Sequence, residues 1–162
     1  MTKLTHTVIL AMALSLMAIN PATASASPEQ AGAAQMPMTS KWRACDFTLM
    51  KWPAATGDAR PFAQVSSSAG TVTANITIHT AVPNTHYDVR VIQTPRPSIG
   101  CGPGAPGVIA GGLQTDGTGV GGVSLVGPVA TDATGAWVIV TRPAAHSQTP
   151  EEFYTTTFIA AI

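Results

Sequence analysis

Charged side chains are scarce in this chain of 162 residues, which has eight basic and eight acidic residues and no net formal charge at pH 7. Proteins that bind nucleic acids or anionic lipid surfaces use clusters of Lys and Arg to neutralise phosphate groups. A near-neutral, sparsely charged chain lacks that means of attraction. We therefore expect no nucleic acid among its partners and no electrostatic attachment to lipid.

The chain also lacks the motifs of common hydrolases. It has no GxSxG motif, in which a serine nucleophile lies on a tight turn between a strand and a helix. Its one pair of adjacent carboxylates, Glu151 and Glu152, would point to opposite sides of a strand, because successive side chains alternate. We therefore assign no catalytic residue and expect the protein not to be an enzyme.

Histidines are few and scattered. His79, His86 and His146 follow the first 26 residues, and a catalytic zinc site uses about three protein ligands. No two of them have the HxH or HxxxH spacing that would place them on one face of an element. A metal-dependent enzyme is therefore only a third hypothesis, and we assign no metal ligand and no cofactor. Asp116 and Asp132 could bind calcium, but an Asp at the head of a Gly-containing turn also bonds its own backbone.

Only two cysteines are present, Cys45 and Cys101. Redox or metal chemistry would use CxxC spacing or nearby histidines, and neither is found around them. In an oxidising compartment a single pair of this kind is most simply a disulfide. Closing the loop between the two would stabilise the fold by roughly 4 kcal/mol, because the unfolded chain loses conformational freedom.

The first 26 residues have the composition of a secretory signal peptide. Lys3 supplies a positive charge, residues 8–19 form an apolar run, and the small residues at 24–26 fit the cleavage rule. The apolar run is too short to span a membrane. No cysteine for lipid attachment follows the cleavage site, and no apolar tail ends the chain. We expect a secreted, extracellular protein, free or loosely associated with the cell envelope, with no membrane span.

Residues 71–91 show the clearest regular pattern in the chain. Apolar residues recur at every second position on both sides of the turn at 83–84: Val72, Ala74, Ile76 and Ile78, then Tyr87, Val89 and Val91. A period of two indicates a strand with one buried face. The segment therefore predicts two strands, 71–79 and 86–91.

Short strand-like segments recur along the rest of the chain, separated by Gly- and Pro-containing turns. We predict further strands at 42–51, 63–67, 108–114, 120–126, 136–141 and 153–162. The strand at 42–51 would turn Cys45 inward, and the polar strand at 63–67 would lie at an edge. Residues 115–119 (TDGTG) predict a hairpin that pairs 108–114 with 120–126.

Two segments have no regular pattern. Residues 27–40 are small, polar and proline-bearing, and predict a disordered leader. Residues 94–107 are rich in Pro and Gly and predict a long surface loop pinned by Cys101. No segment after residue 26 has a helical period. The predicted fold class is all-β, an antiparallel sandwich of about seven to eight strands formed by residues 41–162.

The connection between the two central strands has a recognisable spacing. In residues 82–89, Tyr87 stands where a tyrosine corner would place it, near a strand start, with its hydroxyl bonded to backbone a few residues upstream. A tyrosine corner is found where the chain arches between two packed sheets, so we assign Tyr87 a structural role. The pattern resembles that of fibronectin-type and other immunoglobulin-like domains.

The order of features between residues 70 and 126 extends this resemblance. The features are Gly70-Thr71-Val72, Thr85-His86-Tyr87-Asp88-Val89, the cysteine loop, the turn at 115–119 and Ser124-Leu125. Their layout resembles that of secreted actinobacterial immunoglobulin-like domains, including the enediyne apoproteins of the neocarzinostatin family. The resemblance implies a seven-stranded immunoglobulin-like β-sandwich with a cleft that carries a small apolar ligand. The chain departs from that family's two local disulfides, because it has one widely spaced pair of cysteines.

The tryptophans are the aromatic residues best suited to a sugar-stacking or partner-binding surface. They are Trp42, Trp52 and Trp137. In its strand Trp137 shares a face with Ile139, opposite the valines on either side of Ile139. Either this strand is buried on both faces, or Trp137 and Ile139 form an outer apolar patch. We take Trp137, Ile139 and Trp52 as the candidate binding surface.

These observations lead to one functional hypothesis and two alternatives. The absence of any reactive group of residues, together with the long Gly- and Pro-rich loop, favours a secreted, non-catalytic interaction module. Its partner would be a protein or another component outside the cell or in the envelope. The second hypothesis is a carrier of a small apolar ligand, and the third is the metal-dependent enzyme.

Overall fold

Nine β-strands and no helix form the part of the chain that the computed structural model describes, residues 33–51 and 57–162. The strands are β1 (Ala34–Thr39), β2 (Arg60–Ser68), β3 (Thr71–His79), β4 (His86–Thr94), β5 (Val108–Gln114), β6 (Gly121–Pro128), β7 (Gly135–Arg142), β8 (Glu152–Thr156) and β9 (Ala160–Ala161). The predicted signal peptide, residues 1–26, and Trp52 lie outside the described residues. Within the described ranges, no helix has the length and apolar character needed to cross a bilayer.

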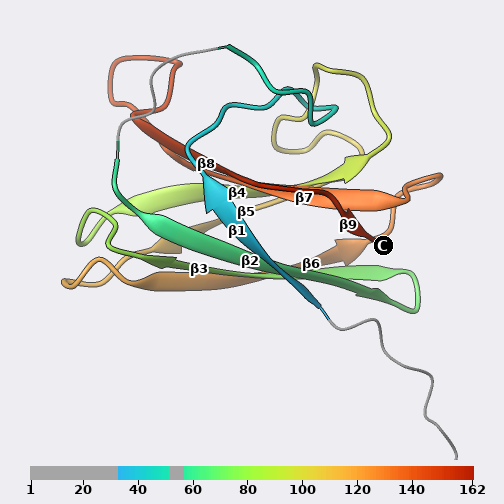
Figure 1. The fold of residues 1–162 in the computed structure, drawn as a ribbon, viewed down its shortest axis with the longest axis horizontal. Coiled ribbons are helices and arrows are strands. Elements are labelled where there is room, and N and C mark those ends of the chain that lie inside the picture. Colours follow the sequence, from blue (N-terminus) through green and yellow to red (C-terminus); the bar gives the residue numbers. More distant parts are fainter. Residues whose placement is uncertain (1–32, 52–56) are drawn as a thin grey trace, which may run out of the picture. The chain divides into compact units, whose positions relative to one another are not determined.

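The strands form two antiparallel sheets that face each other (Figure 1). The first sheet has the order β1-β2-β3-β6, and the second has the order β5-β4-β7-β8, with β9 paired to the start of β7. Because β1 pairs with both β2 and β8, it joins the two sheets along one side. The predicted all-β antiparallel class is confirmed.

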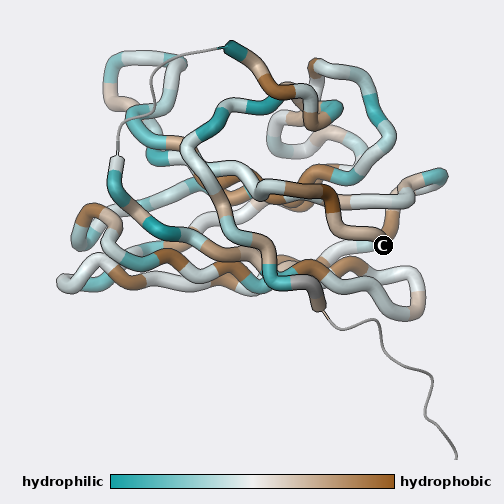
Figure 2. Tube along the Cα trace, in the orientation of Figure 1, coloured by the Kyte–Doolittle hydropathy of each residue, from teal (hydrophilic) through white to brown (hydrophobic). Residues whose placement is uncertain are grey.

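The alternating residues of the central strands form the core between the sheets. The inward residues of β3 and β4 are at most 1% exposed: Val72, Ala74, Ile76, Ile78, Tyr87, Val89 and Val91. Figure 2 shows hydrophobic residues alternating with polar ones along the strands. Burying one large apolar side chain stabilises a fold by about 1.5–3 kcal/mol, so this layer supplies much of the driving force for folding.

Strand β1 corrects the prediction of a disordered leader at 27–40. Met36 and Met38 are buried in the core, and Met36 has no exposed surface. The strand pairs with β2 as far as Pro37 and with β8 from Met38 onward. Proline cannot donate a ladder hydrogen bond, so it fits the point where the strand changes partner. The sequence pattern failed here because only two apolar residues mark the inward face.

The segment after β1 corrects the prediction of a strand at 42–51. Only one isolated bridge, between Arg43 and Leu49, forms within it, and the rest is loop. By contrast, the strand expected at 63–67 is longer than predicted. It is β2, and it lies between β1 and β3 rather than at an edge.

The connection from β5 to β6 corrects the predicted hairpin. β5 pairs with β4 and β6 pairs with β3, so residues 115–120 form an arch between the sheets. A Cβ atom at Gly111 would lie 2.6 Å from Leu125 Cδ2, and one at Gly127 would lie 2.7 Å from Ile109 Cγ1. These glycines let β5 and β6 approach closely, so side chains rather than ladder hydrogen bonds close this side of the sandwich.

Candidate functional site

Three connecting segments lie over the outer face of the second sheet (Figure 1). They are residues 40–51, 95–107 and 143–151. The predicted disulfide between Cys45 and Cys101 is present and joins the first two, with 5.6 Å between the Cα atoms. The N–H group of Cys45 also donates to the carbonyl of Ser98 at 3.0 Å. The first two segments are therefore held to each other as well as to the sheet.

A second, smaller apolar cluster lies beneath these segments. Ile92, Trp137 and Ile139 project from the outer face of the sheet and are at most 2% exposed. Phe47 packs edge-on against Trp137, with 5.6 Å between the ring centroids. The indole N–H of Trp137 donates to the carbonyl of Cys45 at 3.3 Å.

Within the predicted binding surface, Trp137 and Ile139 form no exposed apolar patch. Both side chains are buried, because the loop that carries Phe47 and Cys45 covers them. Of the two arrangements that the sequence left open, β7 adopts the one with both faces buried. Trp52, the third residue of that predicted surface, lies outside the described residues.

Trp42 is the tryptophan at which surface hollows meet. Its ring stands edge-on to Phe153, with 5.0 Å between centroids and an angle of 87° between the planes. Three hollows, of about 350, 300 and 340 Å³, share Trp42 in their linings. We call the three together the Trp42 groove.

Each hollow of the Trp42 groove has its own chemistry. The first has a mixed lining that includes Asp88, Arg90, Thr141 and Gln148. The second, which we call the disulfide hollow, is lined mainly by apolar residues beneath the disulfide: Trp42, Met50, Ile92, Ile99, Trp137 and Ile139. The third lies between Met50 and residues 148–150. Met50 and Ile99 are exposed at the surface, which adds apolar area around the opening.

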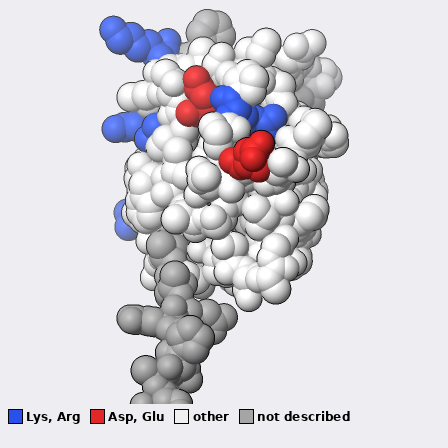
Figure 3. Space-filling view, turned by 90° about the vertical axis from the view of Figure 1, so that its right-hand side faces the viewer, with Lys and Arg blue, Asp and Glu red and all other residues white. Residues whose placement is uncertain are grey.

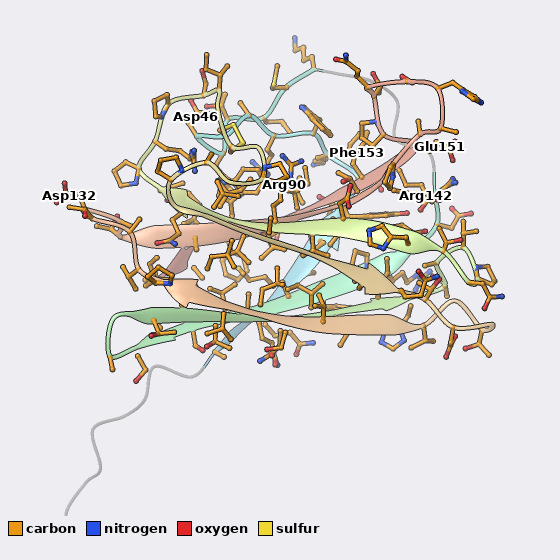
Figure 4. The ribbon with its side chains drawn as sticks, turned by 180° about the vertical axis from the view of Figure 1, so that it is seen from behind. Asp46, Arg90, Asp132, Arg142, Glu151 and Phe153 are labelled. Atoms are coloured by element: carbon orange, nitrogen blue, oxygen red, sulfur yellow. A yellow bond between two sulfur atoms is a disulfide. The ribbon has the colours of Figure 1, made fainter. Side chains whose placement is uncertain are left out.

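Arginine side chains brace the loops around the groove. Arg90 Nη1 donates to the carbonyl of Cys101 at 3.0 Å, and Figure 4 shows Arg90 between the sheet and the loop that carries Asp46. Arg43 Nη1 donates to the carbonyl of Phe47 at 3.0 Å, and its guanidinium carbon lies 3.8 Å from the centroid of that ring. Burial lowers the pKa of both guanidinium groups.

The side of the molecule shown in Figure 3 is largely uncharged. Its acidic side chains lie beside basic ones in one small area, and further basic side chains lie along the left edge of the view. Arg96 also braces the disulfide-linked loop, because its Nη2 donates to the carbonyl of Gly100 at 2.7 Å. It lines a further hollow of about 460 Å³ that adjoins the disulfide hollow through Ile99 and Gly100.

The three histidines do not come together. His79 and His146 are exposed on separate elements, and His86 Nε2 lies 3.1 Å from Asp88 Oδ1. In the part of the chain that the structure describes, no group of three or more His, Cys, Asp or Glu side chains is placed to hold a metal ion. The metal-dependent hypothesis therefore gains no support from the described geometry.

Asp116 bonds its own turn, as its position in the sequence indicates. Its Oδ1 accepts the hydroxyl and N–H groups of Thr118 at 2.7 and 2.8 Å and the N–H group of Val120 at 3.0 Å. These bonds, led by that from the Thr118 hydroxyl, lower the pKa of Asp116. Asp132, the other aspartate considered for calcium, has a left-handed φ of 63° in the turn before β7.

A buried carboxylate between the sheets was missed by the sequence analysis. Glu152 is 3% exposed, and its Oε2 accepts the hydroxyl groups of Tyr87 and Tyr154, each at 3.0 Å. The Tyr87 hydroxyl also accepts the N–H group of Val82 at 3.2 Å, five residues upstream in the arch from β3 to β4. A signal existed in the sequence, because Glu152 and Tyr154 stand two residues apart and so share one strand face.

Arg142 completes this buried network. Its Nε donates to Glu152 Oε1 at 2.9 Å, and its Nη1 contacts Glu151, which lies on the surface (Figure 4). Burial raises the pKa of both tyrosines. Each polar group in the network has a partner, so its geometry is that of a brace for two loops.

The Trp42 groove is thus the surface in the described part of the chain that best fits a binding role. It combines an aromatic ring, braced cations and apolar hollows on loops held by a disulfide. Trp42 and Arg43 are neighbours in the loop after β1, and Arg90 lies on β4, so only folding brings Arg90 to the other two. Comparisons with protein families, with curated proteins and with solved structures find nothing that matches this chain.

Proposed function

We propose that this chain is a secreted, non-catalytic, immunoglobulin-like domain that binds a component outside the cell or in the cell envelope through the Trp42 groove. The observation that carries the proposal is the meeting of three hollows at Trp42, on loops that Cys45 and Cys101 clamp together. Binding surfaces whose loops are already ordered lose less conformational entropy on association. A braced groove of this kind therefore suits recognition.

The immunoglobulin-like part of the proposal is supported by the strand order. Strands β5-β4-β7-β8 face β2-β3-β6, which is the four-against-three arrangement of fibronectin type III domains. β1 is an addition to that arrangement. Secretion is supported by the predicted signal peptide at 1–26 and by the disulfide, which forms and persists in oxidising compartments.

The residue types in the groove support binding to a partner surface. Tryptophan and arginine are enriched among the few residues that contribute most of the energy in protein interfaces. Trp42 and Arg90 line the same two hollows, and apolar Met50 and Ile99 lie beside them. The groove thus has a central anchor and an exposed apolar margin.

Capture from envelope fractions tests this proposal. Immobilised protein should retain a specific component that a Trp42→Ala variant loses. The matched control is Val126→Ala, because Val126 is an exposed apolar residue on β6, in the opposite sheet. A component that both variants retain equally would show that the groove is not the binding surface, and failure of the wild type to retain any component would count against the module itself.

A second candidate function, carriage of a small apolar ligand, is favoured by the disulfide hollow. Its volume of about 300 Å³ and its accessible apolar lining of Trp42, Met50 and Ile99 suit an apolar molecule. Native mass spectrometry of the secreted protein would report a co-purifying small molecule as an added mass. If such a mass were found and no envelope component were captured, carriage would replace the module as the preferred function.

A further inference from the structure

Two cations face the otherwise apolar disulfide hollow. Arg43 and Arg90 both contribute to its lining, together with Ile92, Trp137 and Ile139. Both arginines brace loops through single hydrogen bonds to backbone carbonyls. That bracing uses only part of their hydrogen-bonding capacity.

Neither arginine is paired with a carboxylate among the described residues. The ion pairs found there join His86 to Asp88, and Arg142 to Glu151 and Glu152. The hydrogen bonds of Arg43 and Arg90 go to backbone carbonyls, one from each guanidinium group. Since a guanidinium group has five N–H donors, each retains donors for a further acceptor.

The position of Arg43 makes the need for an acceptor more specific. Its Nε atom is buried and has no hydrogen-bond acceptor within the described ranges. Buried donors in folded proteins nearly always have a partner, because an unmade hydrogen bond is costly. Nε is closed off from solvent, so an acceptor in the hollow reaches it only when the guanidinium group turns toward the ligand.

Charge leads to the same conclusion. Burial lowers the pKa of Arg43 and Arg90, which means that the protein disfavours their charged forms relative to water. Arginine nevertheless stays protonated in proteins, and Asp88 offsets part of this cost at Arg90, so a further anion would be favourable at both groups. Arg96, on the adjoining hollow, adds to the positive potential. The planar guanidinium group matches the geometry of a carboxylate, to which it can donate two parallel bonds.

We propose that the disulfide hollow binds an apolar molecule that carries one carboxylate group. The carboxylate lies between Arg43 and Arg90, and the apolar body packs against the accessible lining formed by Trp42, Met50 and Ile99. This inference rests on the carrier function and adds to it the class of ligand. A volume of about 300 Å³ limits the ligand to a small molecule rather than a folded partner.

The test compares decanoate with 1-decanol, which have the same chain length and differ in charge. Binding is followed by tryptophan fluorescence, since Trp42 and Trp137 line the hollow, and by NMR of the arginine Nε–H groups. We expect decanoate to bind roughly tenfold more tightly than 1-decanol or better, because charge-assisted hydrogen bonds are about twice as strong as neutral ones. The Nε–H signal of Arg43 should shift on addition of decanoate.

Arginine variants locate the effect. Arg43→Gln and Arg90→Gln should each weaken decanoate binding by roughly tenfold and leave 1-decanol binding unchanged. Arg90→Lys keeps the charge but not the planar fork, so it should have an intermediate affinity. The matched control is Arg60→Gln, since Arg60 is exposed on β2 in the opposite sheet and should not affect either ligand. Far-UV circular dichroism checks that each variant is folded.

The outcomes separate the inference from the function on which it rests. Equal binding of decanoate and 1-decanol would overturn the anion site and leave apolar carriage standing. Binding of neither probe by the wild type would overturn both. Tight decanoate binding that the two Gln variants do not weaken would show attachment elsewhere on the protein and would also overturn the anion site, whatever the stability of the variants.

Discussion

Tyr87 and Tyr154, on different strands of the second sheet, donate their hydroxyl groups to the same oxygen atom of Glu152, each at 3.0 Å. Each hydroxyl also accepts a backbone N–H group, that of Val82 for Tyr87 and that of Ala59 for Tyr154. One carboxylate thus fixes the arch between β3 and β4 and the segment that leads into β2. The two loops at this end of the sandwich depend on one buried side chain.

Glu152→Gln is expected to destabilise the fold by about 2 kcal/mol, because hydrogen bonds to a charged group contribute about 1.5–3 kcal/mol and the amide cannot accept all of them. Urea unfolding measures the change. The matched control is Glu151→Gln at the neighbouring surface position, which should cost less than about 1 kcal/mol, since exposed ion pairs contribute little. Equal effects at the two positions would contradict the role assigned to the buried carboxylate.

The two tyrosines are expected to be energetically coupled. Tyr87→Phe and Tyr154→Phe should each cost about 1–2 kcal/mol, because each leaves a backbone N–H group without its acceptor. Since both hydroxyls donate to one oxygen atom, the cost of the double variant should differ from the sum of the single costs by at least about 0.5 kcal/mol. A double-mutant cycle by chemical denaturation measures this difference. Strict additivity would mean that the shared acceptor does not link the two loops.

Removal of the disulfide should loosen the site and leave the sheets in place. Neither Cys45 nor Cys101 belongs to a strand, so Cys45→Ser with Cys101→Ser removes no ladder hydrogen bond. The expected loss is up to about 4 kcal/mol of stability from the freed unfolded chain. Far-UV circular dichroism should keep its β signal, while the fluorescence of Trp137 shifts to the red as the covering loop detaches. Loss of the far-UV signal would show that the loops are needed for the sandwich itself.

Sequence patterns predicted the central strands because their evidence is local. In β3 and the first part of β4 the buried residues occupy every second position, and the structure places them in the core, whereas residues 91–94 of β4 are all buried. The turn at Asp116 was also predicted from its own residues. The strands with which β5 and β6 pair were not predicted. Turn chemistry sets the local direction of the chain, but it does not determine the sheet to which the next strand belongs. The pairing of β6 with β3 sets Leu125 opposite Ala74, two residues that are distant in sequence.

The site was harder to predict because it is assembled from distant segments. Arg90 lies on the polar phase of β4, and its sequence pattern indicates only an outward direction. Arg90 bonds the loop that carries Cys101, and the loop that carries Cys45 and Phe47 buries Trp137. The disulfide joins these two loops. A residue on the outer face of a sheet is exposed or buried according to what packs over it, and alternation along one strand does not contain that information.

Asp116 should make stability depend on pH. Hydrogen bonds from Thr118 and Val120 lower its pKa in the folded protein below that in the unfolded chain. The unfolded protein therefore binds the proton more readily, and the stabilisation is present above the unfolded pKa of about 3.9 and is lost as the pH falls through the folded value. Asp116→Asn should flatten the stability curve in this acidic range. An unchanged slope of unfolding free energy against pH would contradict the assignment.

The closure of the sandwich by β1 gives a final prediction. Among the described strands, β1 alone pairs with strands of both sheets, and Met36 is its fully buried residue. Met36→Ala should cost about 2–5 kcal/mol, because it leaves a cavity in a close-packed core. Gln35→Ala, at the exposed neighbouring position, should stay within about 0.5 kcal/mol of the wild type. If β1 detaches, hydrogen exchange should also become faster at Thr155 and Thr156, the residues of β8 that pair with β1. If the two variants were equally stable, residues 34–39 would be a dispensable leader after all, and β8 would be an open edge in solution.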